Sequence, residues 1–210
     1  MKNYIENLNW RYATKQFDAN KRISQEELDF LLEAIQLSAS SYGLQPYEVI
    51  VVDNPEVQEK LKASAWNQSQ LTDASHVLVF ANMTSVDENY VDAYMKNIAD
   101  TRNINVEDLS GFKDMIKNTI LQLSSEEQSQ WAAKQSYIAL GNLLSAAANF
   151  KIDVCPMEGF DASEFDEILG LKEKNLTAAT IATVGFRSAE DQTQFAAKVR
   201  KSKEDLFTTV

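Results

Sequence analysis

Two pairs of cationic side chains have the spacing needed to hold an anion. Arg11 and Lys15 are four positions apart, so one helical turn would place both side chains on the same side of the chain. Lys198 and Arg200 are two positions apart, so they would point the same way in an extended segment. Together the pairs could bind a phosphate group, although each pair taken alone also fits a solvated surface.

Polar donors near predicted helix ends could complete such a site. Ser40 and Ser41 follow one helical pattern, and Asn67 and Gln70 follow the next one. Combined with the cations, these side chains could bind a phosphate together with a polar ring system. The residue types alone therefore predict an anion-binding protein and do not identify the anion.

The glycines exclude the two standard phosphate-binding loops. The chain has 6 glycines in 210 residues, and the closest two are Gly159 and Gly170. A dinucleotide-binding fingerprint and a P-loop both need glycines within a few positions of each other. Any nucleotide-like ligand must therefore be held by side chains and ordinary backbone.

The rare residues exclude further kinds of site. With 1 cysteine (Cys155) and 1 histidine (His76), one chain can form neither an internal disulfide nor a Cys/His zinc site. No carboxylate spacing suggests another metal, so we expect none. His76 opens the apolar run 77–80, which favours a core or edge position over a catalytic one. Cys155 precedes Pro156 in a mostly apolar stretch and is expected to be a buried, inert thiol.

The overall charge limits the partners. A net charge of −11 and a pI near 4.6 disfavour binding to nucleic acid and to anionic membranes. Cations nevertheless gather in 11–22 and in 187–203. The N-terminus has no apolar core for a signal peptide, and no run approaches the length of a membrane span. We therefore expect a soluble, cytoplasmic protein.

One α+β domain over residues 1–210 is the expected organisation, without repeats or a linker. Strands are expected over 47–52, 76–81 and 177–184, where β-branched and aromatic residues are concentrated. Helical patterns cover 3–11, 24–37, 55–64, 85–123, 124–149 and 161–169. Start signals mark 24–37, 55–64, 85–123 and 124–149, and Gly170 should stop the last helix. The tail 206–210 is β-prone without a local partner, so it could pair with a sheet edge of this or another subunit.

These patterns also predict the burial of particular faces. The first helix should turn Ile5 and Leu8 inward. The polar stretch 85–123 should form a helical cover that starts with a capping box at Ser85. Its apolar stripe would consist of Phe112, Met115, Ile116 and Ile120. Between 137 and 150 the longest helix should be buried on nearly all sides, as in helices shared with a second subunit.

Several segments, in the correct order, resemble the nitroreductase family of flavin-dependent oxidoreductases. Segment 11–17 (RYATKQF) is similar to that family's R-x-S-x-K/R-x-F pattern, and 40–47 (SSYGLQPY) is similar to its S-S-x-N-x-Q-P-W/Y loop. Further matches are 73–77, 156–160, 170–172 and the Lys198-x-Arg200 pair. The similarity runs nearly from end to end and is greatest to the bacterial oxygen-insensitive type. It is weakest over 85–123, where the family builds a variable substrate cover.

This resemblance implies an FMN enzyme with a central mixed, mainly antiparallel sheet flanked by helices. It also implies an intertwined homodimer with two flavin sites at the interface, where Ser40 and Ser41 reach the flavin of the other subunit. Asn67 and Gln70 would lie at the pyrimidine end of the ring, and a backbone N–H of Glu158 or Gly159 would point at N5. The implied cofactor-binding residues are Arg11, Tyr12, Ala13, Lys15, Ser40, Ser41, Asn67, Gln70, Pro156, Met157, Glu158, Gly159, Lys198 and Arg200.

The implied reaction is hydride transfer from NAD(P)H through flavin N5 to a nitroaromatic, quinone or flavin acceptor, by a ping-pong mechanism. Two side chains would have catalytic roles. Lys15 would stabilise negative charge on the flavin, and Glu158 would order water or substrate. Alternatively, the Glu158 carboxylate caps the segment that follows it.

Three positions depart from the family pattern. Ala13 stands where serine is common, Gly43 where asparagine is frequent, and Gln70 where close relatives have lysine. Lys15 is then left as the cation near the ring. Two other functions stay open: a flavin-binding or scavenging protein with little turnover, and a flavin-free acidic interaction module.

Overall fold

A four-stranded sheet in the order β1-β2-β4-β3 forms the centre of the computed structural model, which describes residues 2–210. The strands are β1 (Tyr47–Val52), β2 (His76–Met83), β3 (Asp153–Met157) and β4 (Leu176–Gly185). Neighbouring strands run antiparallel, and the described residues add one isolated parallel bridge, between Ala13 and Val154. The expected α+β class with a mainly antiparallel sheet is confirmed.

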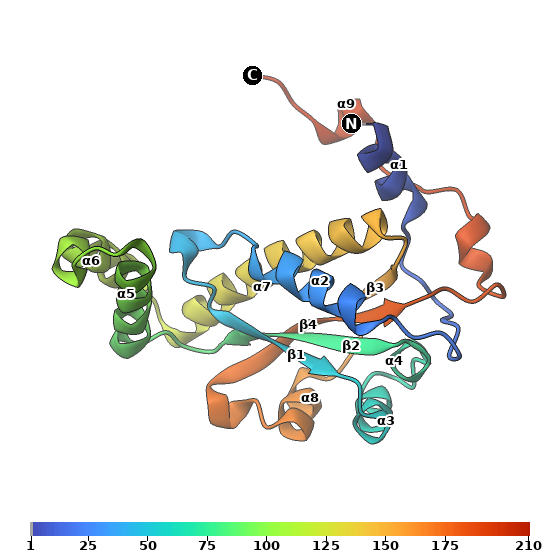
Figure 1. Cartoon of the computed structure of the whole chain (residues 1–210), viewed down its shortest axis with the longest axis horizontal. Helices are drawn as coiled ribbons and strands as arrows, with labels where there is room; N and C mark the ends of the chain where they lie inside the picture. Colours follow the sequence, from blue (N-terminus) through green and yellow to red (C-terminus); the bar gives the residue numbers. More distant parts are fainter. Residues whose placement is uncertain (1) are drawn as a thin grey trace.

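Helices cover both faces of the sheet (Figure 1). On one face lie α2 (Gln25–Gln36) and α7 (Ser125–Asn149), and on the other lie α3 (Pro55–Ala63), α4 (Gln70–Asp73) and α8 (Ala162–Leu169). Outside these layers are α1 (Lys2–Trp10), α5 (Glu88–Arg102), α6 (Ser110–Thr119) and α9 (Lys203–Leu206). Short 3-10 helices are η1 (Ser41–Gly43), η2 (Val106–Leu109), η3 (Lys172–Lys174) and η4 (Gln192–Phe195).

Local signals set the ends of several helices as the sequence predicts. Ser24 and Ser124 each form a capping box with the glutamate three residues later, at the starts of α2 and α7. Asn54 caps α3 ahead of Pro55. Gly170 ends α8 in the left-handed conformation, with φ of 63°.

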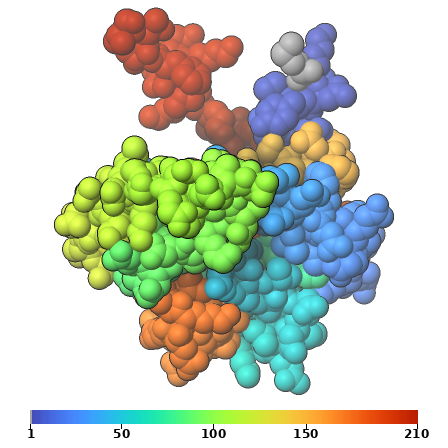
Figure 2. Space-filling view, turned by 60° about the vertical axis from the view of Figure 1, so that its left-hand side comes forward, coloured from blue at the N-terminus to red at the C-terminus, as the bar shows by residue number. Residues whose placement is uncertain are grey.

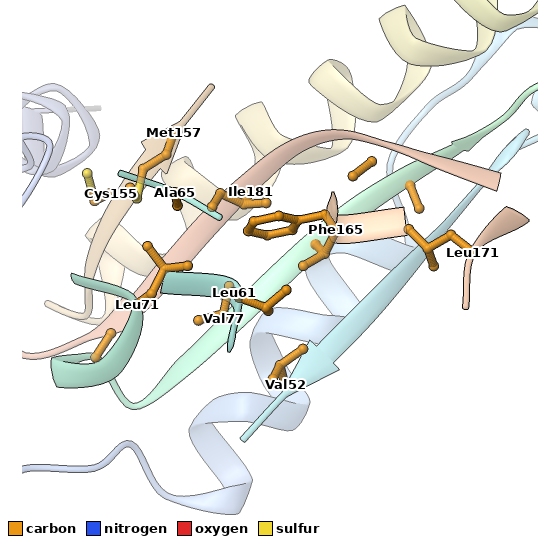
Figure 3. Close-up of a cluster of buried hydrophobic side chains, with 14 of the residues drawn as sticks. Val52, Leu61, Ala65, Leu71, Val77, Cys155, Met157, Phe165, Leu171 and Ile181 are labelled. Carbon is orange, nitrogen blue, oxygen red and sulfur yellow. The ribbon is translucent and has the colours of Figure 1, made fainter. Parts of the chain in front are cut away.

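Successive side chains of β2 point to opposite faces of the sheet and contribute to two hydrophobic cores. Val77, Val79 and Ala81 face the layer of α3, α4 and α8, which contributes Leu61, Leu71 and Phe165 (Figure 3). Leu78 and Phe80 face the layer of α2 and α7. Full burial of side chains of this size stabilises the fold by about 1.5–3 kcal/mol each. Both helical layers are therefore fixed to the strands.

Strand β3 is not predicted from the sequence, because Pro156 lies inside it and proline normally argues against a strand. The structure places β3 at the edge of the sheet, where Pro156 pairs with Ala182 of β4 and needs no ladder hydrogen bond on its outer side. The N-terminal segment reaches the same strand through the bridge between Ala13 and Val154. The predicted site residues of the N-terminal segment and those at the end of β3 are therefore brought together by this strand.

Helix α7 is buried on one face only, so the expectation that its second half is buried on nearly all sides is wrong for the single chain. Ala139 and Leu143 pack in the core with α2 and the sheet. Tyr137 and Ile138 are 41% and 46% exposed. Within one chain, no segment of residues 2–210 covers this second face.

The cover over 85–123 consists of α5, η2 and α6, and it has a small core of its own. Asp87 caps α5 by accepting a hydrogen bond from the backbone N–H of Tyr90. The predicted capping box at Ser85 is therefore wrong. The Ser85 hydroxyl instead donates to Oδ1 of Asn175, which ties the start of the cover to the loop before β4.

The apolar stripe of the cover is narrower than predicted. Ile116 and Ile120 are buried, and Phe112 is partly buried against the same core. Met115 is 55% exposed. It is rotated by one residue, about 100°, from Ile116 and so lies off the buried side of α6.

Both ends of the chain stand away from the main body (Figure 2). α1 meets the end of α7 through polar groups, with Asn7 Nδ2 donating to Asn149 Oδ1 at 2.7 Å. Leu8 is partly buried, but Ile5 is 58% exposed, because only one side of α1 contacts the rest of the chain. Of the predicted tail 206–210, Leu206 ends α9, and none of its residues pairs with a strand within residues 2–210. Pairing with a sheet edge of another subunit stays a prediction.

Candidate functional site

The segment after α1 is extended rather than helical. α1 ends before Arg11, and Ala13 forms a bridge with Val154. The expected helical turn between Arg11 and Lys15 is therefore wrong. Lys15 lies at a bend and Thr14 is buried, so regular alternation ends here. Burial has the larger effect on the pKa of the Cys155 thiol and raises it, but the positive charges of Arg11 and Lys15 both act to lower it, so the two cations nevertheless lie near the same part of β3.

The C-terminal segment brings Lys198 and Arg200 next to Arg11. Lys198 Nζ donates to the backbone oxygens of Leu8, at 2.7 Å, and of Arg11. This is the C-terminal end of α1, where the helix dipole favours a cation. The three cations line a pocket of about 310 Å³ between the two ends of the chain. The lining also includes Tyr12 and Ala13.

The charges of this pocket are not neutralised by carboxylates. Burial and the positive charge of Arg200 lower the pKa of Arg11, and burial, Arg11 and Arg200 lower the pKa of Lys198. Among the ion pairs within residues 2–210, none includes Arg11, Lys198 or Arg200. Burial is the larger cause of both pKa shifts, and repulsion among the three cations adds to it, so an anion bound here would be stabilised.

Two other basic residues in these stretches already have partners. Arg187 forms an ion pair of 2.6 Å with Asp153 and stacks on the ring of Trp10. Lys21 pairs with Asp18. These residues support the local structure and do not add to the charge available in the pocket.

The turn after β3 forms a second part of the candidate site. Glu158 Oε1 accepts a hydrogen bond of 2.6 Å from the Tyr137 hydroxyl, and both residues line a pocket of about 320 Å³ with Pro156 and Met157. Burial and the bond to Glu158 raise the pKa of Tyr137 to about 12, so its hydroxyl keeps its proton at neutral pH. The alternative that Glu158 caps the following helix is wrong, because Asp161 is that N-cap.

A short segment before α4 lies against this turn. Gln68 Nε2 donates to the backbone oxygen of Gly159 at 2.7 Å. The ring of Trp66 is so close to Gly159 that a Cβ there would collide with it. Asn67 is left-handed, with φ of 57°, and exposed, whereas Gln70 is 7% exposed. Asn67 and Gln70 thus lie on either side of Gln68, which contacts the Pro156–Gly159 turn.

The predicted serine contacts lie at the other end of the molecule (Figure 1). The backbone N–H of Ser41 donates to Gln135 Oε1 in the middle of α7, at 2.8 Å. The cation pocket lies beyond the last residue of α7, where Asn7 of α1 contacts Asn149. The helix rise of about 1.5 Å per residue separates Gln135 from Asn149 by roughly 21 Å. Within one chain, Ser40 and Ser41 are therefore not brought to the cation pocket.

Two tyrosines of the cover hold this serine loop. The Tyr94 hydroxyl donates to the backbone oxygen of Tyr42 at 2.7 Å, and the Tyr90 hydroxyl donates to that of Leu44 at 2.9 Å. Tyr42 and Gly43 are both left-handed, with φ of 57° and 76°. The cover over 85–123 thus fixes the loop for which flavin contacts are predicted.

Sequence reasoning missed Asp191, which is almost fully buried behind the N-terminal segment. Its Oδ2 accepts hydrogen bonds from the backbone N–H groups of Lys15, at 2.8 Å, and of Gln16, at 3.2 Å. The neighbours Glu190 and Gln192 are exposed polar residues, so nothing in the local pattern distinguishes this acid from a surface one. Only the distant partner segment reveals it.

The remaining rare residues are structural. Cys155 is buried, as expected, and burial raises the pKa of its thiol. His76 is partly buried at the start of β2, and burial lowers its pKa. Within residues 2–210, His, Cys, Asp and Glu side chains do not gather into a potential metal cluster. No helix in the described part of the chain has the length and apolar character needed to cross a membrane.

Comparison with protein families and curated proteins gives concordant matches. The model described as the nitroreductase family matches residues 8–186. The oxygen-insensitive NAD(P)H nitroreductase of Salmonella typhimurium is 35% identical over 222 residues, which cover 95% of this chain and 94% of the relative. The protein of the same name from Enterobacter cloacae is 33% identical over 213 residues, with the same coverage of 95% and 94%.

Solved structures share the fold over the whole chain. The ydfN protein of Bacillus subtilis superposes with a TM-score of 0.89 at 20% identity and covers 100% of both chains. A protein of Exiguobacterium sibiricum, solved in complex with FMN, superposes with a TM-score of 0.83 at 19% identity, over 99% of this chain and 97% of that one. At these identities the likeness establishes the fold.

Proposed function

Because the chain belongs to the nitroreductase family, we propose that it is an FMN-dependent NAD(P)H oxidoreductase that reduces nitroaromatic, quinone or flavin acceptors. This is a family of oxidoreductases, and the relatives from Salmonella typhimurium and Enterobacter cloacae are named as NAD(P)H nitroreductases. We further propose that it acts in the cytoplasm, where reduced nicotinamides are supplied.

The observation that carries this proposal is the set of unneutralised cations between the two chain ends. Arg11, Lys198 and Arg200 line one pocket, and mutual repulsion contributes to lowering the pKa values of Arg11 and Lys198. A phosphate monoester would relieve that repulsion and accept charge-assisted hydrogen bonds. The pocket thus fits the terminal phosphate of FMN without a glycine-rich loop.

The other predicted residues fit the rest of the cofactor. Tyr12 and Ala13 line the same pocket, and Lys15 lies two residues further along the same segment. Asn67 and Gln70 would bind polar atoms of the ring, and the Pro156–Gly159 turn would lie along one face. When bound, FMN supplies the hydride chemistry, accepting two electrons from the nicotinamide and delivering them to the acceptor. If one open slot serves nicotinamide and acceptor in turn, the kinetics are ping-pong.

The proposal includes a homodimer. One chain leaves an exposed apolar face on α7, including Ile138, and places Ser40 and Ser41 far from the cation pocket. In a two-fold dimer, the serine loop of one protomer can reach the pocket of the other. The site is then completed only by two copies of the chain.

The test starts with the absorbance spectrum of the purified protein, followed by anaerobic titration with NADH and with NADPH. We expect bound flavin that is bleached by at least one nicotinamide and reoxidised by menadione or a nitroarene. Initial rates at several acceptor concentrations should give parallel double-reciprocal lines. A flavin that is bound but barely reduced by either nicotinamide would favour the scavenging alternative, and a protein without flavin affinity would contradict both.

A further inference from the structure

The side chain of Asp191 is buried, at 1% exposure, and its carboxylate accepts four hydrogen bonds. Its Oδ2 accepts from the Tyr12 hydroxyl at 2.9 Å and from the backbone N–H groups of Lys15 and Gln16. Its Oδ1 accepts from the backbone N–H of Thr193 at 2.9 Å. One carboxylate therefore binds two segments that lie about 180 positions apart in the sequence, and each of its oxygens serves a different segment.

These two segments form opposite walls of the cation pocket. Tyr12 belongs to the N-terminal wall with Arg11, and Thr193 begins the C-terminal wall that continues to Lys198 and Arg200. Asp191 itself does not line the pocket, so it lies behind both walls. A second contact supports the same junction, because the backbone N–H of Ser188 donates to the backbone oxygen of Gln16 at 2.9 Å.

These four hydrogen bonds stabilise the ionised carboxylate of Asp191. Burial by itself would raise the pKa of the carboxyl, but the N–H groups of Lys15, Thr193 and Gln16 and the Tyr12 hydroxyl lower it below its ordinary value. The carboxylate is therefore ionised at neutral pH, and it forms no ion pair with the pocket cations among the described residues. It holds the walls without neutralising them.

We propose that Asp191 is a positioning residue that sets the spacing between Arg11 and the Lys198–Arg200 pair and thereby gives the site its preference for a phosphate-bearing flavin. This inference rests on the proposed function. The direct consequence is a change in the ratio of FMN affinity to riboflavin affinity. Riboflavin has the same ring system and ribityl side chain as FMN but lacks the phosphate. Loss of Asp191 should weaken FMN binding and leave riboflavin binding almost unchanged.

Asp191→Asn is the informative variant. An amide has one oxygen, and if that oxygen stays with the three donors at Oδ2, the NH2 group faces the backbone N–H of Thr193. The C-terminal wall then loses its anchor. Loss of a buried, charge-assisted hydrogen bond corresponds to about 10-fold or more in affinity. Tyr12→Phe removes one of the four bonds, keeps the carboxylate and should shift the ratio in the same direction by less.

The matched control is Asp166→Asn. Asp166 is also buried, at 5% exposure, and accepts from the Thr177 hydroxyl and the backbone N–H of Ala178, both at 2.8 Å, but it ties α8 to β4 away from the pocket. This variant should lower thermal stability and leave the ratio of FMN to riboflavin affinity as in the wild type. A purely structural role of Asp191 would give that same result for Asp191→Asn.

Dissociation constants for FMN and riboflavin are measured by flavin fluorescence quenching with the full chain, for the wild type and the three variants. A ratio that falls about 10-fold in Asp191→Asn and less in Tyr12→Phe supports the inference. A wild-type preference for FMN that both variants retain in full overturns it and leaves the proposed function intact. A wild type that binds FMN no better than riboflavin overturns both.

Discussion

The hydroxyl of Tyr137 donates a hydrogen bond of 2.6 Å to Oε1 of Glu158 and so joins the exposed face of α7 to the turn after β3. The carboxylate is thereby fixed at one pocket and kept from capping α8. We propose that Glu158 orders water or substrate, and a side chain in that role must be held in one orientation, because small displacements of a positioned group lower the rate. Tyr137 supplies that constraint to Glu158.

Tyr137→Phe should therefore lower turnover with menadione by about 3–10-fold, the equivalent of one hydrogen bond to a charged group partly replaced by water. Binding of FMN should be unchanged. Because the pKa of Tyr137 is raised to about 12, the hydroxyl stays protonated, and the wild-type rate should show no ionisation of this tyrosine between about pH 6 and 10. Steady-state rates across that range check both points.

The double variant Tyr137→Phe/Glu158→Gln distinguishes a role of Tyr137 in positioning Glu158 from a simple loss of packing. If Tyr137 acts through Glu158, the two effects on kcat are not additive, and the double variant is about as slow as Glu158→Gln alone. Fully additive effects would contradict the positioning role.

Lys15→Ala should slow flavin reduction by NADH more than Gln70→Ala. Lys15 carries the positive charge that can stabilise negative charge accumulating in the ring system, by an estimated 10-fold or more in rate. Gln70 is neutral, with an amide that can only donate a hydrogen bond. Stopped-flow absorbance under anaerobic conditions gives the two rate constants. Equal rates for wild type and Lys15→Ala would remove Lys15 from the assignment.

Gly43→Ala should destabilise the protein by about 1–2 kcal/mol, because position 43 is left-handed, with φ of 76°, and a Cβ there would run into the Tyr94 hydroxyl. Adding Tyr94→Phe removes the oxygen that the methyl group meets. The double variant should then be more stable than the sum of the two single effects predicts. Urea unfolding of the four proteins measures this, and strict additivity would mean that the hydroxyl is not the obstacle.

Asp191 should also make stability depend on pH in a defined direction. Its hydrogen bonds lower the folded-state pKa below the unfolded value of about 3.9, so its contribution is present above that value and is lost as the pH falls through the folded pKa. The stability difference between wild type and Asp191→Asn should be largest near pH 7 and shrink below about pH 4. Urea unfolding near pH 7 and below about pH 4 measures this stability difference. A difference that is the same at both pH values would contradict the lowered pKa of Asp191.

Local signals account for the parts of the fold that the sequence predicts correctly. Ser24 and Ser124 start their helices through contacts within one turn, so their residue pattern is sufficient. β3 is different, because its Pro156 is acceptable only at a sheet edge, and the strand order depends on the whole chain. Ser85 fails for a related reason: it is drawn to Asn175, 90 positions away, and Asp87 takes the cap.

The candidate site follows the same division. The residue pattern finds Arg11, Lys198 and Arg200 because they belong to closely spaced cation pairs in an acidic chain, and the structure gathers them in one pocket. It does not find Asp191 or Tyr137, because neither the buried acid nor the exposed tyrosine differs from a surface residue until its partner, 21 or more positions away, is known. Positioning residues are therefore the part of a site that single-sequence reasoning misses.

Ile138→Asp tests whether the exposed face of α7 completes the site. Ile138 is 46% exposed in the single chain, and a carboxylate there would be desolvated in an interface formed by two copies of α7. We expect the wild type to elute as a dimer with FMN, and the variant to elute as a monomer that has lost at least about 10-fold in FMN affinity. Ile104→Asp is the matched control, because Ile104 is similarly exposed, at 42%, but lies in the cover. A monomeric Ile138→Asp protein that binds FMN as tightly as the wild type would show that one chain forms the whole site.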